Sequence, residues 1–366
     1  MKYISEWKKR QHARHALKSF ARKLSSRRRA KMHRRMQLAV FLNIDIDNHP
    51  GFSNRGGNRA VQIRIIIPEV LSFSECHNET MRFFRHLRSV ALKKQNRIFF
   101  DFRSLRVICP SSALVLAAEI DRWRRLRGIR PRIKQLRQMD KNISRLLNEM
   151  GLFDVVEATN PPAKQNDDKA DIIFIPFRSE NKTMGERASE IAKDLEKITG
   201  KKLQGRSFLY RGLSEAMTNV ANHAYPEGEA IEFPVVKGQW WMFASFQKST
   251  QRLTVTFYDQ GVGIPRTLPR VHTVEVVLGI LRQLGLIDDD ASRIKASTIV
   301  GHSQTRQAHR GKGLKDMKRF THMVQDGFLR ILSGRGEYVY YTNGSDECFA
   351  HQHDIGGTLI QWTARI

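Results

Sequence analysis

The sequence predicts an α/β protein built from two domains, and three observations support this. Between residues 58 and 157, short apolar runs that suit strands alternate with runs at helical spacing. Residues 158–171 interrupt this pattern with Pro161, Pro162 and several charges, and residues 172–366 then resume it. Strands and helices in alternation are typical of α/β domains, and 366 residues of which 40% are hydrophobic are enough for two cores.

Residues 1–50 precede the first domain and predict a basic helical arm. Residues 1–40 contain fourteen Lys or Arg against one acid, so they carry +13 of the formal net charge of +27. Apolar residues occur at helical spacing at Ala13, Leu17, Phe20 and Leu24. Such a helix can bind nucleic acid, an anionic membrane surface or an acidic partner, or it can pack on the body of the protein. The sequence leaves these alternatives open.

The first domain, residues 58–157, is expected to alternate strands and helices. The expected elements are a strand at Val61–Ile67, a helix at Glu79–Lys94, a strand at Arg97–Phe102, a helix at Ser111–Arg125, an extended segment at Pro131–Arg137 and a helix at Ile143–Met150.

The second domain follows the linker at residues 158–171. Its expected elements are a strand at Ile172–Pro176, a helix at Met184–Thr199, a hairpin of Gln239–Gln247 and Arg252–Asp259, a helix at Val274–Leu284, strands at Phe328–Leu332 and Tyr338–Thr342, and a last strand after Gly356. Between the helix at Met184–Thr199 and the hairpin, the chain has one more helix, and this helix has an unusual polar face.

That helix carries Glu215, Asn219 and His223 on one stripe, because each step of four residues turns by only about 40°. Apolar residues fill the opposite side at Leu209, Leu213, Ala216, Met217, Val220 and Ala224. A solvent-facing stripe in so basic a chain should contain Lys or Arg, yet none occurs from Gly212 to Val236. The stripe therefore indicates a packed binding site.

Two glycine-containing segments follow at a distance along the chain. An alternating apolar strand ends at Asp259, and Gly261 and Gly263 come directly after it, where backbone can approach a ligand. Later, the residues Arg310, Gly311, Lys312 and Gly313 open a helical pattern. A helix start of this kind offers free N–H groups to phosphate.

With these segments in this order, residues 180–366 resemble the histidine-kinase-like (GHKL) ATPase superfamily. Glu215, Asn219 and His223 match its N box, and Asp259, Gly261 and Gly263 its first glycine box. Its second glycine box is matched by Gly311 and Gly313, and its closing strand motif by Gly357 and Thr358. The sequence from Glu215 to Asn219, with His223 one turn later, is most similar to that of anti-sigma-factor Ser/Thr kinases. The resemblance implies an α/β sandwich with a mixed sheet and an ATP lid, formed here by the polar tract from Asp288 to His309.

The resemblance also implies roles for these residues, with ATP and Mg²⁺ as the cofactors. Glu215 would be the catalytic base and Asn219 the side-chain ligand of Mg²⁺. Asp259 would accept a hydrogen bond from the amine of adenine, supported by Thr358. The glycines Gly261, Gly263, Gly311 and Gly313 would let backbone approach the nucleotide, with Arg310 and Lys312 as charge clamps on the phosphates. We expect His223 to be buried and hydrogen-bonded.

The first domain resembles the STAS domain of anti-sigma-factor antagonists. The resemblance lies in the strand ending Phe99-Phe100-Asp101-Phe102 and in Cys109-Pro110-Ser111-Ser112-Ala113 at a helix start. In that family a serine at this position accepts phosphate, which implies Ser112 here. Pro110 and Ala113 depart from the family pattern, and the alternative is that Ser111 and Ser112 cap the helix. We favour the cap.

Three functions compete on these grounds. The favoured one is a Ser/Thr protein kinase of the anti-sigma type, which regulates a protein partner by phosphorylation or by nucleotide-dependent binding. The second is an ATP-hydrolysing conformational switch, associated with nucleic acid through residues 1–40. The third, a sensor-type histidine kinase, is disfavoured because no histidine occurs between His86 and His223 to accept phosphate.

Composition sets the expected cellular setting. No apolar run approaches the ~20 residues needed to span a bilayer. The three cysteines, Cys76, Cys109 and Cys348, are far apart and show no disulfide or zinc spacing. We therefore expect a cytoplasmic protein, and the resembled families lead us to consider a homodimer.

Overall fold

The computed structural model describes residues 61–91, 96–128, 132–133, 135–156, 158, 161, 170–180, 185–300 and 313–366. The predicted basic arm and most of the predicted linker lie outside these described residues. The described chain is of mixed α/β type, as the sequence predicts. Among its described helices none is long and apolar enough to cross a membrane.

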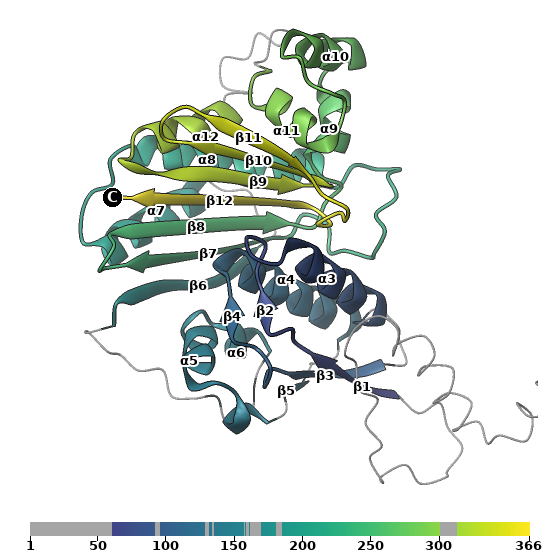
Figure 1. The fold of residues 1–366 in the computed structure, drawn as a ribbon, viewed down its shortest axis with the longest axis vertical. Helices are drawn as coiled ribbons and strands as arrows, with labels where there is room; N and C mark the ends of the chain where they lie inside the picture. Colours follow the sequence, from purple (N-terminus) through teal and green to yellow (C-terminus); the bar gives the residue numbers. More distant parts are fainter. Residues whose placement is uncertain are drawn as a thin grey trace, which may run out of the picture.

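A seven-stranded sheet forms the centre of the molecule (Figure 1). In spatial order its strands are β11 (Asp346–Ala350), β10 (Gly336–Tyr341), β9 (Asp326–Ser333), β12 (Thr358–Arg365), β8 (Arg252–Asp259), β7 (Trp240–Gln247) and β6 (Ile172–Glu180). Every neighbouring pair is antiparallel, so the mixed sheet expected from the sequence is wrong. The reason is that two meanders, β6 to β8 and β9 to β11, flank β12, which runs antiparallel to both of its neighbours.

Three helices cover one face of this sheet: α7 (Gly185–Thr199), α8 (Arg206–Asn219) and α12 (Gly313–His322). The predicted apolar stripe of α8 is confirmed, because all six of its residues are buried in the core that this layer shares with the sheet. Side chains alternate across each strand, so Trp240 and Met242 face these helices, whereas Trp241 and Phe243 face the other way. The central strands of the sheet, such as β7 and β8, are therefore buried on both faces.

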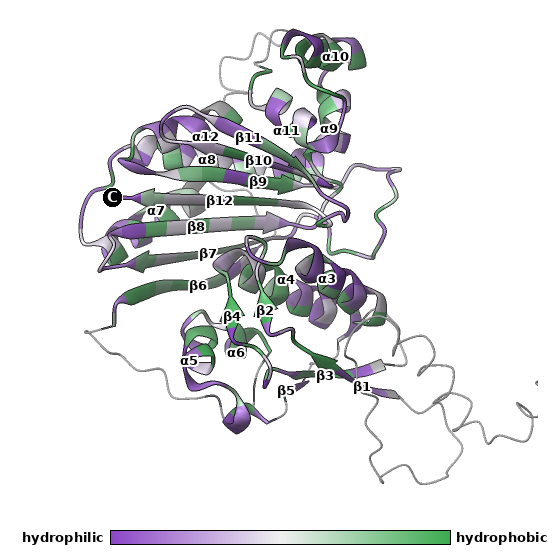
Figure 2. Ribbon diagram, viewed as in Figure 1, coloured by the Kyte–Doolittle hydropathy of each residue, from purple (hydrophilic) through white to green (hydrophobic). Residues whose placement is uncertain are grey.

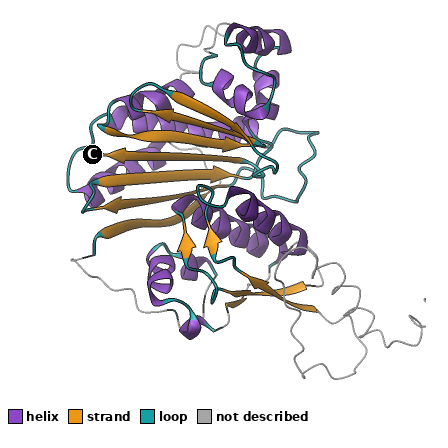
Figure 3. Ribbon diagram, viewed as in Figure 1, coloured by secondary structure: helices purple, strands orange, loops and turns teal. Residues whose placement is uncertain are grey.

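The N-terminal unit, residues 61–156, packs on that second face (Figures 1 and 3). It has a parallel sheet of β1 (Val61–Ile66), β3 (Asn96–Asp101) and β5 (Arg132–Ile133), and a parallel pair of β2 (Val70–Leu71) and β4 (Val107–Ile108). Its helices are α3 (His77–Ala91), α4 (Pro110–Arg127), α5 (Lys141–Glu149) and α6 (Leu152–Val155). In Figure 2 the strands β2, β4 and β6, close to the junction, are coloured mostly hydrophobic.

Helix α4 joins the two units. It contacts β6, β7 and β8 of the large sheet, and thirteen successive residues from Ser111 to Trp123 are buried. The indole Nε1 of Trp241 donates to Asp121 Oδ2 at 3.0 Å. A helix that is buried nearly all round must form part of a core. The two predicted domains thus share one continuous apolar cluster.

A helical insertion between β8 and β9 projects beyond the sheet, at the top of Figure 1. It contains α9 (Ile264–Val271), α10 (Val274–Gln283) and α11 (Asp290–Ser297), with a small core of Leu268, Val277, Leu281 and Ala296. The sequence predicted only α10 and a polar tract. The missed α11 begins where the Asp289 carboxylate accepts a hydrogen bond from the N–H of Ser292 at 2.8 Å.

The first unit departs from expectation in further places. It contains β2, β4 and α6, which we did not predict. We expected Pro131–Arg137 to be extended, but among its described residues only Arg132–Ile133 form a strand, and Leu136–Gln138 is a 3-10 turn. Gln135 before this turn has φ of 61°, which stops the strand.

Candidate functional site

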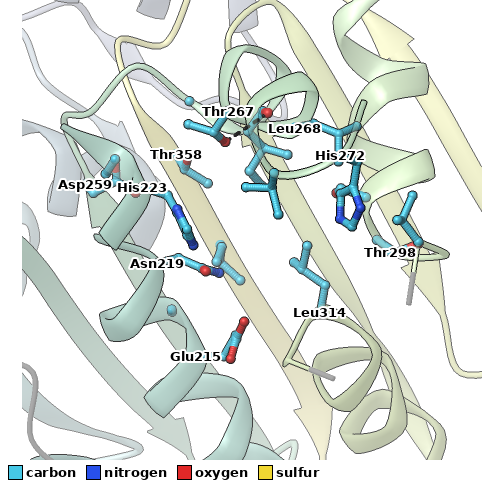
Figure 4. Close-up of a pocket in the computed structure, with 18 of the residues that line it drawn as sticks. Glu215, Asn219, His223, Asp259, Thr267, Leu268, His272, Thr298, Leu314 and Thr358 are labelled. Carbon is cyan, nitrogen blue, oxygen red and sulfur yellow. Dashed lines mark hydrogen bonds between the residues drawn. The ribbon is translucent and has the colours of Figure 1, made fainter. Parts of the chain in front are cut away.

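A cleft lies between α8, the ends of β8 and β12, and the helical insertion (Figure 4). It encloses a volume of about 180 Å³ and is open to solvent at its mouth. Six predicted site residues line it: Glu215, Asn219, His223, Asp259, Gly263 and Thr358. They are far apart in the sequence, so their meeting is a result of the fold.

One wall of the cleft is the polar stripe of α8 and its continuation. Glu215 and Asn219 are half-buried one turn apart, and both side chains point into the cleft in Figure 4. The helix then widens into a π-helical segment, Val220–Ala224. Such segments are rare in proteins, and those that occur are often found at functional sites. His223 lies on this segment and is exposed, so our expectation of a buried histidine is wrong.

The widened turn meets the glycine loop after β8. The Val262 N–H donates to the carbonyl of Ala224 at 2.8 Å, and a Cβ on Gly261 would lie 2.3 Å from that same oxygen. Gly261 therefore accommodates the helix end, and it does not line the cleft. Gly263 does line it, with φ of 85° and no room for a Cβ beside Ser333 Oγ at 2.8 Å. At both positions a side chain would clash with neighbouring residues of the same chain, so glycine is required there.

Asp259 lies deep in the cleft at the end of β8, with 6% of its surface exposed. Its Oδ1 accepts a hydrogen bond from the Gly261 N–H at 2.8 Å, and its carboxyl also accepts one from the Thr358 N–H. Burial nevertheless outweighs these bonds and raises the pKa of Asp259 to about 7. Thr358 is its direct partner across the β8–β12 pair.

Glu215 has a similar environment with a different neighbour. Burial, and then the negative charge of Asp316 on α12, raise the pKa of Glu215 above its ordinary value. Asp316 is itself held by Arg211 at 3.0 Å and Arg319 at 3.1 Å. A carboxylate whose pKa is raised toward neutrality is suited to act as a general base.

The opposite wall comes from the insertion and from α12. In Figure 4, Leu268, His272 and Thr298 lie across the cleft from the α8 stripe, with Leu314 at the start of α12. Of these residues only Thr298 lies in the tract from Asp288 to His309 that we expected to be a lid, and none of them was predicted to line a site. The usable signals were Pro265 in the first turn of α9 and the Asp289 cap of α11, both typical of helix starts.

The second glycine segment is described only in part. Gly313 begins α12, as predicted, and brings Leu314 to the cleft. Arg310, Gly311 and Lys312 lie outside the described residues. The role expected for these three therefore stays a prediction.

Ser112 does not belong to this site. It is fully buried at the start of α4, and α4 packs on the sheet face opposite to the one that carries α8. The cap alternative is also wrong, because the residue at the cap position is Cys109 and no side chain caps the helix. The hydroxyls of Ser111 and Ser112 instead lie 3.2 and 3.1 Å from Cys109 Sγ.

The cleft thus combines a half-buried carboxylate, an amide one turn away and a buried carboxyl beside backbone donors. These groups can accept a proton, ligate a hard cation and recognise an amine. Comparison with known proteins finds no matching family model and no matching curated protein.

Proposed function

We propose that this cleft binds ATP with Mg²⁺, and that residues 180–366 form a GHKL-type ATPase unit. The observation that carries the proposal is that Glu215, Asn219, Asp259 and Thr358 line one cavity although the resemblance matched them to three separate motifs. A chance match to separate motifs would scatter the residues over the surface.

Each of these residues would contact a different part of the ligand, according to the chemistry of its side chain. Asp259 is buried and lines the cleft, where its carboxylate would accept a hydrogen bond from the exocyclic amine of adenine. Asn219 offers a side-chain oxygen, the ligand type that Mg²⁺ prefers, and the ion would neutralise phosphate charge. Glu215, one turn further, would take the proton from the attacking hydroxyl.

The reaction that we favour is transfer of the γ-phosphate to a serine or threonine of a partner protein. The acceptor would lie on another chain, because Ser112 is buried on the far side of the sheet from the cleft. The N-terminal unit, which we propose to be STAS-like, would then serve as a docking or regulatory module. We further propose a cytoplasmic setting, and a basic arm that contacts an acidic surface.

An ATP-hydrolysing switch is the second candidate, and one observation favours it. The insertion α9–α11 has a small hydrophobic core of its own and, with α12, forms the wall of the cleft opposite α8. A unit that is packed internally can move as a rigid lid when a nucleotide binds, which is the usual basis of such switches.

One experiment tests the proposal and separates the two candidates. The purified chain is incubated with γ-labelled ATP and Mg²⁺, with and without a bacterial protein extract, and free phosphate and labelled protein are followed together. Asn219→Ala is the blank. Label on an added protein supports the kinase, free phosphate alone supports the switch, and absence of ATP binding by equilibrium dialysis overturns the proposal.

A further inference from the structure

A second cluster of ligating side chains lies where the N-terminal unit meets the edge of the large sheet. His77 at the start of α3, Glu337 on β10 and His351 just after β11 each place one ligand atom within 4.8 Å of the other two. The chain brings them together from both units. The cluster is separate from the cleft, since none of its members lines that cavity.

Neighbouring groups already orient His77. Its Nδ1 lies 3.3 Å from the carbonyl oxygen of Phe73, and a carbonyl can only accept, so Nδ1 carries the proton. The lone pair is then on Nε2. A ring whose other nitrogen donates to a backbone carbonyl is the usual arrangement for a histidine that binds metal.

Glu337 is oriented in the same way by its second oxygen. Oε1 accepts from Arg330 Nε at 2.7 Å, whereas Oε2 lies 2.7 Å from His351 Nε2. The same arginine donates to Ser74 Oγ at 3.0 Å and to the Phe73 carbonyl at 3.2 Å. The groups that orient the cluster therefore also come from both units.

The two imidazole rings are stacked, with centroids 3.5 Å apart and planes 12° from parallel. The His351 ring faces Glu337 through Nε2, and the His77 ring lies against it. A metal ion would replace the hydrogen bond between His351 Nε2 and Glu337 Oε2, and the soft outer torsion of histidine lets the His351 ring adjust.

We propose that His77, Glu337 and His351 bind a zinc ion, with water in the fourth position. Two imidazoles and one carboxylate are a recognised tetrahedral ligand set for this metal. The ion would fasten the start of α3 to β10 and to the residue after β11. It would thereby hold the N-terminal unit against the sheet, while its fourth position stays open to water.

The test uses the full-length chain after removal of metal with a chelator. Cobalt(II) is titrated in, because its visible absorption reports tetrahedral coordination, and zinc is then added in competition. We expect the wild-type chain to develop one tetrahedral cobalt signal per molecule, displaced by zinc. His77→Gln should lose it, with zinc affinity at this site weakened by at least about 10–100-fold.

The matched control is His353→Gln, which changes a half-buried histidine two residues from His351 but outside the cluster. This variant should keep the signal. Zinc should also raise the midpoint of thermal unfolding in the wild type and in His353→Gln but not in His77→Gln, with circular dichroism confirming that each variant is folded. A cobalt signal that is equal in the wild type and in His77→Gln, or absent from the wild type, overturns the proposal.

Discussion

The Nε2 of Gln260 lies 3.3 Å from Oε1 of Glu119, and both side chains are buried. Gln260 directly follows Asp259 in the cleft, whereas Glu119 belongs to α4 on the other face of the sheet. Glu119 also accepts from Arg88 Nε at 2.8 Å and forms an ion pair with Arg122. Arg88 in turn donates to the carbonyl of Ile355 at 2.6 Å, three residues before Thr358. One buried network therefore connects the N-terminal unit to both strand ends that form the cleft.

This network predicts an order of stabilities. Glu119→Gln leaves two buried guanidinium groups without their carboxylate, and we expect it to reduce the free energy of unfolding by about 3–5 kcal/mol. Arg88→Met should cost less, because the pair of Glu119 and Arg122 survives. Urea unfolding of the three proteins measures the order. If Arg88→Met is the more destabilised variant, the buried carboxylate is not the centre of the network.

The proposed role of Glu215 as the general base predicts that its substitution affects turnover but not ATP binding. Glu215→Gln should retain ATP binding and lower turnover by about 10²–10⁴-fold, since the shape is kept and only the proton acceptor is lost. Asn219→Ala should lose the Mg²⁺-dependent part of ATP binding. Calorimetry and phosphate release measure the two effects. Turnover by Glu215→Gln equal to wild type would exclude this residue as the base.

The buried carboxyl of Asp259 predicts a pH dependence of stability. Its folded pKa of about 7 lies above the ordinary value of 3.8, so the folded protein keeps the proton longer. Stability from this group is therefore complete below about pH 4 and is lost as the pH rises to 7. Relative to Asp259→Asn, the wild-type free energy of unfolding should fall by roughly 1.4 kcal/mol per pH unit in that window. Urea unfolding without nucleotide checks this, and parallel curves for the two proteins would contradict it.

The contact of Gly261 with the π-helical segment predicts a packing effect. Gly261→Ala would bring a methyl group to 2.3 Å from the Ala224 carbonyl, so we expect destabilisation of about 1–3 kcal/mol. Gly279→Ala is the matched control, because nothing lies within 4 Å of its added Cβ in the middle of α10. That change should be neutral or stabilising by up to about 1 kcal/mol. Thermal unfolding compares them, and equal midpoints would refute the packing role.

Periodicity was sufficient for most regular elements and for the apolar stripe of α8. Local sequence patterns did not predict the helices whose apolar spacing was short or was interrupted by unfavourable residues. Helix α9 contains Pro269 in its interior, and the acidic start of α11 resembles a loop until the Asp289 cap is recognised. His223 follows the helical stripe and lines the cleft, but on the π-helical segment it is exposed and not buried.

The amino-acid order alone was enough to predict a mixed α/β protein and the polar stripe of Glu215 and Asn219, and the resemblance to the GHKL superfamily added Asp259 and Thr358. It could not specify how the units pack. The antiparallel order of the large sheet, the burial of Ser112 and the meeting of His77 with Glu337 depend on contacts between residues far apart in the chain. Such contacts arise when two apolar faces are buried together, and no local sequence pattern encodes which faces those are.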